Sequence, residues 1–375
     1  MPDPLGPRHL RHLGDFSGLA ELAMTQRELF PPPGPGLRDS AREVLGVLEL
    51  TAADVRTERT WTADGLSGEE VSWDVGFGPR THAYVLRPDR AGDSVLPGVV
   101  ALHCHAGMKW AGKEKIADGP EGPSPEVARL RAALYDGRAW AAELARRGFT
   151  VLVPDVLGWG SRRFPPADMP DGAPGESGVP LSAADRYDLA AARHEHVLAK
   201  YCTVLGTSYA GVVAGEDLAA AAYLRSRADV GAVGCAGLSG GGLRAALLGA
   251  FDRDVDAVAV VAMISSYRDL LDGFVARHTW MLYPPGLSRL CDLPDLVASG
   301  APRPLLVWYG ERDEILPLSG MRRAHAMIAA HYRQVQVGYT GIFADAGHSF
   351  GRAAQERVFG WLARHLEADG GTAWR

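Results

Sequence analysis

The chain has 375 residues and a mass of 40.0 kDa, and 47% of its residues are hydrophobic while 22% are charged. These values are typical of a soluble globular protein with one large domain or two, and no run of about 18 apolar residues predicts a membrane span. The formal net charge of -6 argues against nucleic acid or an anionic membrane as the main partner, because both favour a basic surface.

The four cysteines, at positions 104, 202, 235 and 291, show no C-x-x-C spacing, so the sequence does not imply disulfides. Cys235 lies in an apolar run that predicts a buried thiol. The N-terminus mixes Asp3 and Asp15 with prolines and lacks the apolar stretch of a secretory signal. We therefore expect a cytoplasmic protein.

Residues 1–50 predict an N-terminal helical arm, because helical patterns at 19–29 and 40–48 flank the breaker sequence PPPGPG. From residue 51 to about 370 we expect one main domain. Its first part contains three alternating runs separated by turn residues, at 55–63, 69–75 and 81–88. Such runs suit antiparallel strands at one edge of a sheet.

Continuous apolar runs then alternate with helical spacing, which is the βαβ signature. The predicted strands are 98–103, 150–155, 230–236, 257–263 and 304–310, with helices at 127–147 and 240–251 and a further strand-like run, QVQVGY, at 334–339. The fold class is therefore α/β, with a mostly parallel central sheet, antiparallel N-terminal edge strands and helices on both faces.

Two insertions interrupt this alternation, at about 161–225 and 264–302. The first begins with a Pro-, Gly- and Asp-rich stretch at 161–183 and becomes helical from residue 184, which favours a lid or rim over an active site. Aromatic residues cluster in the second. We expect Trp159, His278 and Trp280 to contribute to a substrate pocket, although ordinary core packing explains such residues equally well.

The sequence GLSGG at 237–241 fits G-x-S-x-G, follows an apolar strand directly and opens a predicted helix. A serine on such a tight strand-to-helix turn is exposed at the carboxyl end of the sheet, and the glycines relieve crowding in the turn. We expect Ser239 to be a nucleophile. The amide of Gly240, at the helix start, points to where an oxyanion develops.

A serine nucleophile needs a base and a carboxylate, which follow it in the order acid, then histidine. Asp313 lies in a charged turn after the strand at 304–310, and His348 lies in a loop after the run at 334–339. Asp345 and Glu311 are alternative acids, but Asp345 precedes the histidine by only three residues. Two further histidines, His194 and His196, lie in the long helical segment and are weaker candidates for residues that reach the pocket.

The loop after the strand at 98–103 reads HCHAGM and is expected to supply a second oxyanion amide, from His105 or Ala106. His103 and His105 also fit an H-x-H metal pair. No further ligands stand at matching spacing, so we expect no metal.

These motifs resemble the branch of the α/β-hydrolase superfamily that holds acetylxylan-esterase-like and dipeptidyl-aminopeptidase-like enzymes, related to dienelactone hydrolases. The shared features are LHCHAG with KEK at 113–115, DVLGWGSRR at 155–163, the serine turn, and APRPLL leading to Asp313. The resemblance spans about residues 55–365 and implies an α/β-hydrolase fold and a triad of Ser239, Asp313 and His348. The family usually has His-Gly in the oxyanion loop, whereas this chain has Cys104 after His103.

The resemblance also implies ester or amide substrates and no cofactor. We expect a serine esterase that cleaves a small-molecule carboxylic ester, with a small acyl group such as acetyl as one option, through an acyl-serine intermediate. The alternatives are an exopeptidase or amidase with the same triad, and a binding protein that kept the fold without the chemistry. Homo-oligomerisation stays open.

Overall fold

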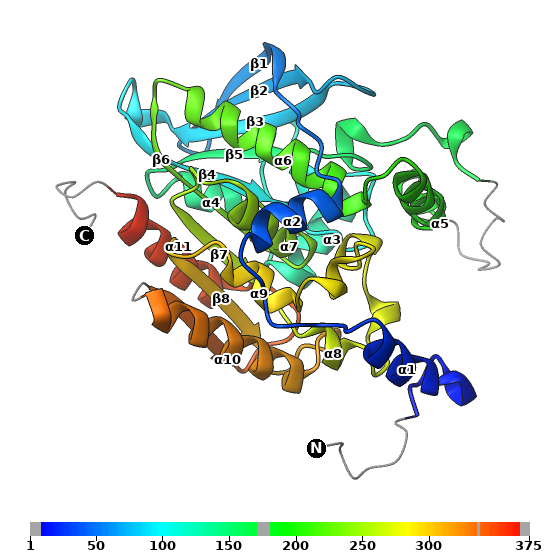
Figure 1. Ribbon diagram of the computed structural model, residues 1–375. Helices are drawn as coiled ribbons and strands as arrows, with labels where there is room; N and C mark the ends of the chain where they lie inside the picture. The colour runs from blue at the N-terminus through cyan, green and yellow to red at the C-terminus, as the bar shows by residue number, and fades with distance from the viewer. Residues whose placement is uncertain (1–8, 171–180, 336–337, 368–375) are drawn as a thin grey trace.

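The computed structural model describes residues 9–170, 181–335 and 338–367, and the strands within them form one nine-stranded sheet in the order β1-β2-β3-β5-β4-β6-β7-β8-β9 (Figure 1). The strands are β1 (Ala53–Ala63), β2 (Leu66–Asp74), β3 (Thr81–Pro88), β4 (Leu96–Leu102), β5 (Thr150–Pro154), β6 (Val230–Leu238), β7 (Ala257–Val261), β8 (Leu305–Gly310) and β9 (Tyr339–Ala344). The helices are α1 (Gly18–Gln26), α2 (Leu37–Leu45), α3 (Pro125–Leu134), α4 (Trp140–Ala145), α5 (Ala183–Val204), α6 (Tyr209–Ser226), α7 (Gly240–Phe251), α8 (Tyr267–Leu270), α9 (Leu293–Ala298), α10 (Leu318–Val335) and α11 (Arg352–Leu366).

The sheet is antiparallel at its N-terminal end and parallel elsewhere. β1, β2, β3 and β5 pair antiparallel in turn, whereas β5, β4, β6, β7, β8 and β9 pair parallel. The carboxyl ends of the parallel strands therefore share one edge of the sheet, where ligands bind in open α/β sheets. The predicted fold class is confirmed.

Two hydrophobic layers cover the two faces of the sheet, because successive side chains of a strand point to opposite sides. On β4, Val100 and Leu102 pack toward α2, α6, α7, α9 and α10, while Val99 and Ala101 pack toward α4 and α11. Figure 1 shows α6 crossing the first of these faces. The helices thus flank the sheet on both sides.

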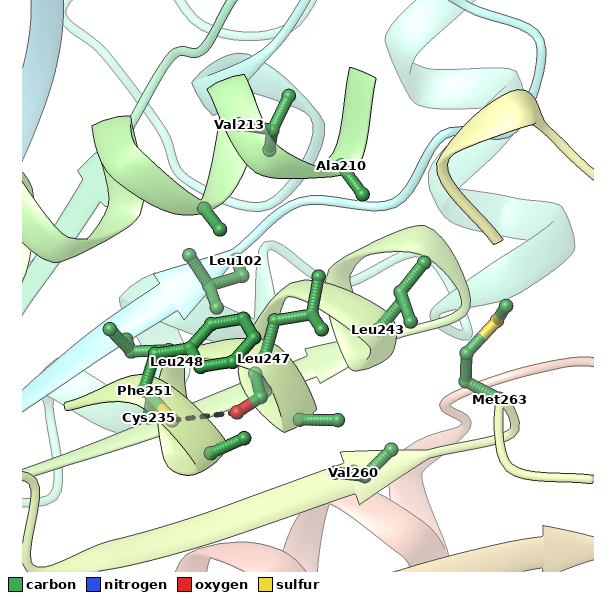
Figure 2. Packing of buried hydrophobic residues seen from close by; sticks show 14 of the residues in the cluster. Leu102, Ala210, Val213, Cys235, Leu243, Leu247, Leu248, Phe251, Val260 and Met263 are labelled. Carbon is green, nitrogen blue, oxygen red and sulfur yellow. Dashed lines mark hydrogen bonds between the residues drawn. The ribbon is translucent and has the colours of Figure 1, made fainter. Parts of the chain in front are cut away.

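Helix α7 lies in the centre of the first layer, and all of its residues are buried. Figure 2 shows Leu247, Leu248 and Phe251 of α7 beside Leu102 of β4 and Cys235 of β6. Burial of each such side chain stabilises the fold by about 1.5–3 kcal/mol. The start of α7, which carries the serine turn, is therefore held firmly against the sheet.

Three local predictions differ from the structure. The helical segments at 127–147 and 184–225 are each divided, near Gly137 and at Gly206, which adopt φ values of 77° and 75°. Glycine accepts this conformation without steric cost, so each helix ends there. The strand-like run at 334–339 overlaps the end of α10 and residues 336–337 outside the described residues, and β9 begins only at Tyr339.

The two helices of the N-terminal arm pack differently on the main domain. Helix α2 buries Leu37, Ala41 and Leu45 in the main core, whereas α1 has no buried residue.

Residues 171–180 of the predicted lid lie outside the described residues. No single helix of the described residues is long and apolar enough to cross a membrane; α5 and α6 meet that test only as a pair, with a bend of 85° between them.

Candidate active site

Ser239 occupies a strained turn between β6 and α7. Its backbone has φ 57° and ψ -124°, a conformation that L-residues rarely adopt. The turn is crowded by β4, since a Cβ on Gly241 would lie 2.1 Å from the carbonyl oxygen of Leu102. The amide of Ser239 donates to the carbonyl of Val261 at 2.9 Å. The strain is thus imposed by neighbouring backbone, and the serine side chain reaches a cavity at the sheet edge.

His348 and Asp313 meet because β8 and β9 are parallel neighbours whose ends, Gly310 and Ala344, are paired in register. Nδ1 of His348 lies 2.7 Å from Oδ2 of Asp313. The other carboxylate oxygen of Asp313 accepts hydrogen bonds from the amides of Ile315 and Leu316, at 2.9 and 3.2 Å. In the neutral ring this pairing places the hydrogen on Nδ1 and leaves Nε2 as a proton acceptor.

The two alternative acids lie elsewhere. Asp345 is exposed and forms an ion pair of 2.6 Å with Arg312. Glu311 faces Arg322 at 3.6 Å on the surface. Of the three candidate carboxylates, only Asp313 contacts His348, so the geometry favours the sequence-based choice.

The backbone of His105 lies against Gly240 at the start of α7. A Cβ on Gly240 would come within 3.0 Å of both the nitrogen and the Cβ of His105. Among the described residues, neither of these two amides donates to a backbone carbonyl. Ala106 follows with φ 51° and lines the same cavity, but its atoms are not among those nearest to Gly240. Gly240 therefore lies against the backbone of His105 rather than that of Ala106, which makes the amides of Gly240 and His105 the candidate oxyanion donors.

We expect Gly240→Ala to lower kcat for an activated ester, by at most about 100- to 1,000-fold, which is the usual effect of losing one oxyanion donor. Because the core holds α7 in place, the new methyl group must push the backbone of His105 away by a few tenths of an ångström, which misplaces its amide. Steady-state kinetics with p-nitrophenyl acetate would measure the effect. Gly360→Ala in α11, whose methyl group meets only Arg364 at 3.8 Å, is the control. Full activity in Gly240→Ala would exclude His105 as a donor.

The ring of His105 is held from behind by Glu195 of α5, a residue that the sequence analysis did not identify. Nε2 of His105 lies 2.8 Å from Oε2 of Glu195, and the amide of Gly107 donates to Nδ1 at 3.0 Å. Lys109 approaches the same carboxylate oxygen at 2.6 Å. The other oxygen accepts from the hydroxyl of Thr279 at 2.6 Å. Glu195 thus joins the first insertion to the oxyanion loop and the second insertion.

The electrostatics of this cluster are consistent with a neutral imidazole beside a carboxylate. Burial lowers the pKa of His105, and the hydrogen bond to Glu195 only partly opposes this effect. Burial would raise the pKa of Glu195, but the hydrogen bond from His105 and the charge of Lys109 hold it well below its usual range. The acceptor at Nδ1 requires the hydrogen of His105 on Nε2, where it is donated to Glu195.

One signal in the sequence of α5 could have revealed Glu195. The buried positions of that helix are Ala184, Tyr187, Ala191, Glu195, Ala199 and Cys202. Their spacing follows one face of a helix. A glutamate on an otherwise apolar face is rarely buried unless it is paired. This spacing could have revealed a buried carboxylate with a partner, but it does not identify the partner.

Ser239, Gly240, His105 and His348 line one cavity of about 590 Å³. Leu130, Met263 and Ile315 contribute apolar wall, and Arg129 and Arg277 also line it. This volume lies within the usual range for small-molecule sites. The cavity draws on α3, on the oxyanion loop and on the second insertion.

The three residues predicted to bind substrate are placed differently. His278 lines the cavity and its Nε2 lies 2.8 Å from the carbonyl oxygen of Ile315, while burial lowers its pKa to about 4. Trp159 is buried beneath His105, with ring centroids 5.2 Å apart, and does not line the cavity. Trp280 is partly exposed outside the cavity wall and donates to Nδ1 of His196 at 2.8 Å.

Three of the four ring nitrogens of the H-x-H pair contact other protein groups, and Nε2 of His103 is buried without a hydrogen-bond partner among the described residues. Both ring nitrogens of His105 are engaged by Gly107 and Glu195, and Nδ1 of His103 faces the carbonyl of Cys104 at 3.2 Å. In the part of the chain that the structure describes, no three His, Cys, Asp or Glu side chains group in a way that would hold a metal ion.

A sheet with this strand order, covered by helices on both faces and carrying a serine turn after β6, defines an α/β-hydrolase fold. The chain belongs to the Alpha/beta hydrolase family, whose sequence profile matches residues 99–361. The predicted membership of the α/β-hydrolase superfamily is therefore confirmed.

Comparison with curated proteins finds YtaP of Bacillus subtilis (strain 168), provisionally named a hydrolase, at 23% identity over 267 residues, which is 70% of this chain and 76% of that protein. A Bacteroides fragilis NCTC 9343 protein provisionally named an acetyl xylan esterase has a similar structure, with a TM-score of 0.65, 16% identity and coverage of 89% of this chain and 83% of the other. A glucuronoyl esterase from Solibacter usitatus gives a TM-score of 0.59 and 14% identity, with coverage of 88% and 92%. At these identities, the structural likeness is one of fold.

Proposed function

We propose that this protein is a serine esterase that hydrolyses a carboxylic ester through an acyl-serine intermediate. The observation that carries the proposal is the convergence of Ser239, held at φ 57°, and the His348–Asp313 pair, joined at 2.7 Å, on one cavity. A serine needs an oriented base to act as a nucleophile at neutral pH. A purely structural serine needs neither the strained turn nor the base.

Each group has one role in the reaction. The hydroxyl of Ser239 attacks the ester carbonyl while Nε2 of His348 takes its proton, and Asp313 stabilises the imidazolium through its bond to Nδ1. The amides of His105 and Gly240 bind the oxyanion of the tetrahedral intermediate. The intermediate collapses, the alcohol leaves with the proton from His348, and a water molecule then releases the acid by the same steps.

The relatives support an ester rather than an amide. The proteins of similar fold include one provisionally named an acetyl xylan esterase and one named a glucuronoyl esterase. The cavity of about 590 Å³ exceeds what an acetyl group alone would fill, so it has room for a bulkier acyl group or for part of the alcohol. We therefore propose a small-molecule ester with a bulky alcohol or a bulky acyl group.

Active-site labelling tests the proposal directly. A fluorophosphonate probe is expected to add one phosphonyl group to the protein, and peptide mass spectrometry should locate it on Ser239. The same preparation should hydrolyse p-nitrophenyl acetate faster than an aminoacyl p-nitroanilide. Preferential cleavage of the anilide would indicate a peptidase or amidase, and neither labelling nor turnover would indicate a binding protein.

A further inference from the structure

The peptide unit between Cys104 and His105 connects the oxyanion hole with a buried lysine. Its N–H, carried by His105, lies against Gly240, as the 3.0 Å approach of a Cβ at that glycine indicates. Its C=O, carried by Cys104, accepts a hydrogen bond of 2.8 Å from Nζ of Lys115. In a trans peptide the N–H and C=O point in opposite directions. Nζ of Lys115 therefore lies on the carbonyl side of this peptide, opposite the N–H side that faces Gly240.

Lys115 is fully buried, with 0% of its surface exposed, in the 3-10 helix Lys113–Lys115. Nζ of Lys115 also donates to the carbonyl of His105 at 3.2 Å, and Arg131 holds the backbone carbonyl of Lys115 at 3.2 Å. In the described part of the chain, Lys115 forms no ion pair. A buried ammonium without a contacting carboxylate is costly, so stabilisation by an ion pair does not explain it.

We propose that Lys115 is a positioning residue for the oxyanion hole, whose ammonium group holds and polarises the Cys104–His105 peptide so that the N–H of His105 binds the oxyanion more strongly. The inference rests on the proposed esterase function. A cation at the carbonyl end draws electron density along the peptide and leaves the N–H more positive. Hydrogen bonds in such chains strengthen one another by about 10–30% per bond in condensed-phase estimates.

The charge state of Lys115 depends on groups from several elements. Burial lowers its pKa to about 8, although the nearby Cys104, Asp188 of α5 and Asp155 after β5 favour the charged form. Arg244 of α7 disfavours the charged form. Lys115 is therefore mostly protonated at pH 7 and loses its charge as the pH rises through about 8.

The imidazoles that face this ammonium do not contribute a competing charge at pH 7. Burial lowers the pKa of both His103 and His105, so both rings are neutral there. Lys109 and Glu195 form their own ion pair at 2.6 Å. Burial also lowers the pKa of Lys109, but it is Lys115 that contacts the carbonyl of Cys104, so the Lys115 variants identify which lysine causes a change in rate with pH.

The test compares Lys115→Met, which removes charge and donor, with Lys115→Gln, which retains a neutral donor of shorter reach. Hydrolysis of p-nitrophenyl acetate is followed from pH 6 to pH 10 after subtraction of spontaneous hydrolysis. At pH 7 we expect kcat to fall about 10- to 100-fold in Lys115→Met, a fraction of the effect of losing a whole oxyanion donor, and less in Lys115→Gln. KM should change less than about threefold, because the effect arises in the transition state.

The pH profile is the readout that a merely structural lysine would not change. In the unsubstituted protein kcat should fall above pH 8 and level off near the value of Lys115→Gln, whereas both variants should lack this decline. Lys200→Met, which removes an exposed lysine of α5, is the matched control and should behave as the unsubstituted protein does. Thermal melts of every variant report folding.

Equal kcat values at pH 7 in folded Lys115→Gln and the unsubstituted protein would overturn the inference while the esterase function stands. If both variants fail to fold, the unsubstituted protein still decides, because a profile without a decline above pH 8 overturns it. If the unsubstituted protein shows no hydrolysis that depends on Ser239, both proposals fail together.

Discussion

Ser239→Ala is expected to lower kcat/KM for p-nitrophenyl acetate by a factor of about 10⁶, and Asp313→Asn alone by about 10⁴. The asparagine would keep the hydrogen bonds from Ile315 and Leu316 through its oxygen, and its amide nitrogen would face Nδ1 of His348. That arrangement moves the hydrogen of the ring to Nε2, which then cannot accept the serine proton. Rates measured with each variant at saturating and subsaturating ester separate kcat from KM.

The double variant provides the sharper test. Because the three groups act as a unit, Ser239→Ala combined with Asp313→Asn should be no slower than Ser239→Ala alone. Asp345→Ala, at the exposed alternative acid, should retain full activity. A large loss in Asp345→Ala, or additive losses in the double variant, would contradict the assignment of Asp313 to the triad.

Asp217→Ala is expected to lower the free energy of unfolding by about 3–5 kcal/mol, because it leaves the buried guanidinium of Arg244 without a counter-charge. Asp217 and Arg244 form two parallel hydrogen bonds of 2.7 and 2.9 Å between α6 and α7. The same arginine donates to the carbonyl of His103 at 3.3 Å. Urea denaturation followed by circular dichroism would measure the loss.

Two further variants show whether the loss of stability comes from the unpaired buried charge. Arg312→Ala, at an exposed ion pair, should change stability by less than about 1 kcal/mol. Replacing both buried partners, with Asp217→Leu and Arg244→Met, should be less destabilising than Asp217→Ala, because no charge is left unpaired. If Asp217→Ala is as stable as the unsubstituted protein, the pair does not carry the packing of α6 on α7.

The sequence was sufficient to predict the sheet and the positions at which the candidate site residues meet. The antiparallel edge, the parallel strands and the turn at Ser239 follow from short runs of apolar and glycine residues. The pairing of Asp313 with His348 follows from two loops at the ends of neighbouring strands, since parallel strands present their carboxyl ends together. The strand at 81–88 has the predicted bounds.

The remaining features depend on distances that the sequence does not contain. Glu195 contacts His105 across 90 positions of the chain. Trp159 was expected in the pocket, but it is buried beneath His105. The alternating run before β9 was misleading because a few alternating residues at the end of a helix do not distinguish helix from strand.

The carboxylate of Glu195 receives hydrogen bonds from the oxyanion loop and from Thr279 and Trp280 of the second insertion. An engineer who wishes to change substrate range would naturally exchange residues 264–302 for another sequence. Such a graft would also remove two hydrogen-bond donors to this carboxylate, which would then hold the ring of His105 less firmly. Chimaeras of this region should therefore preserve a hydroxyl at 279, or turnover will be lost together with the old specificity.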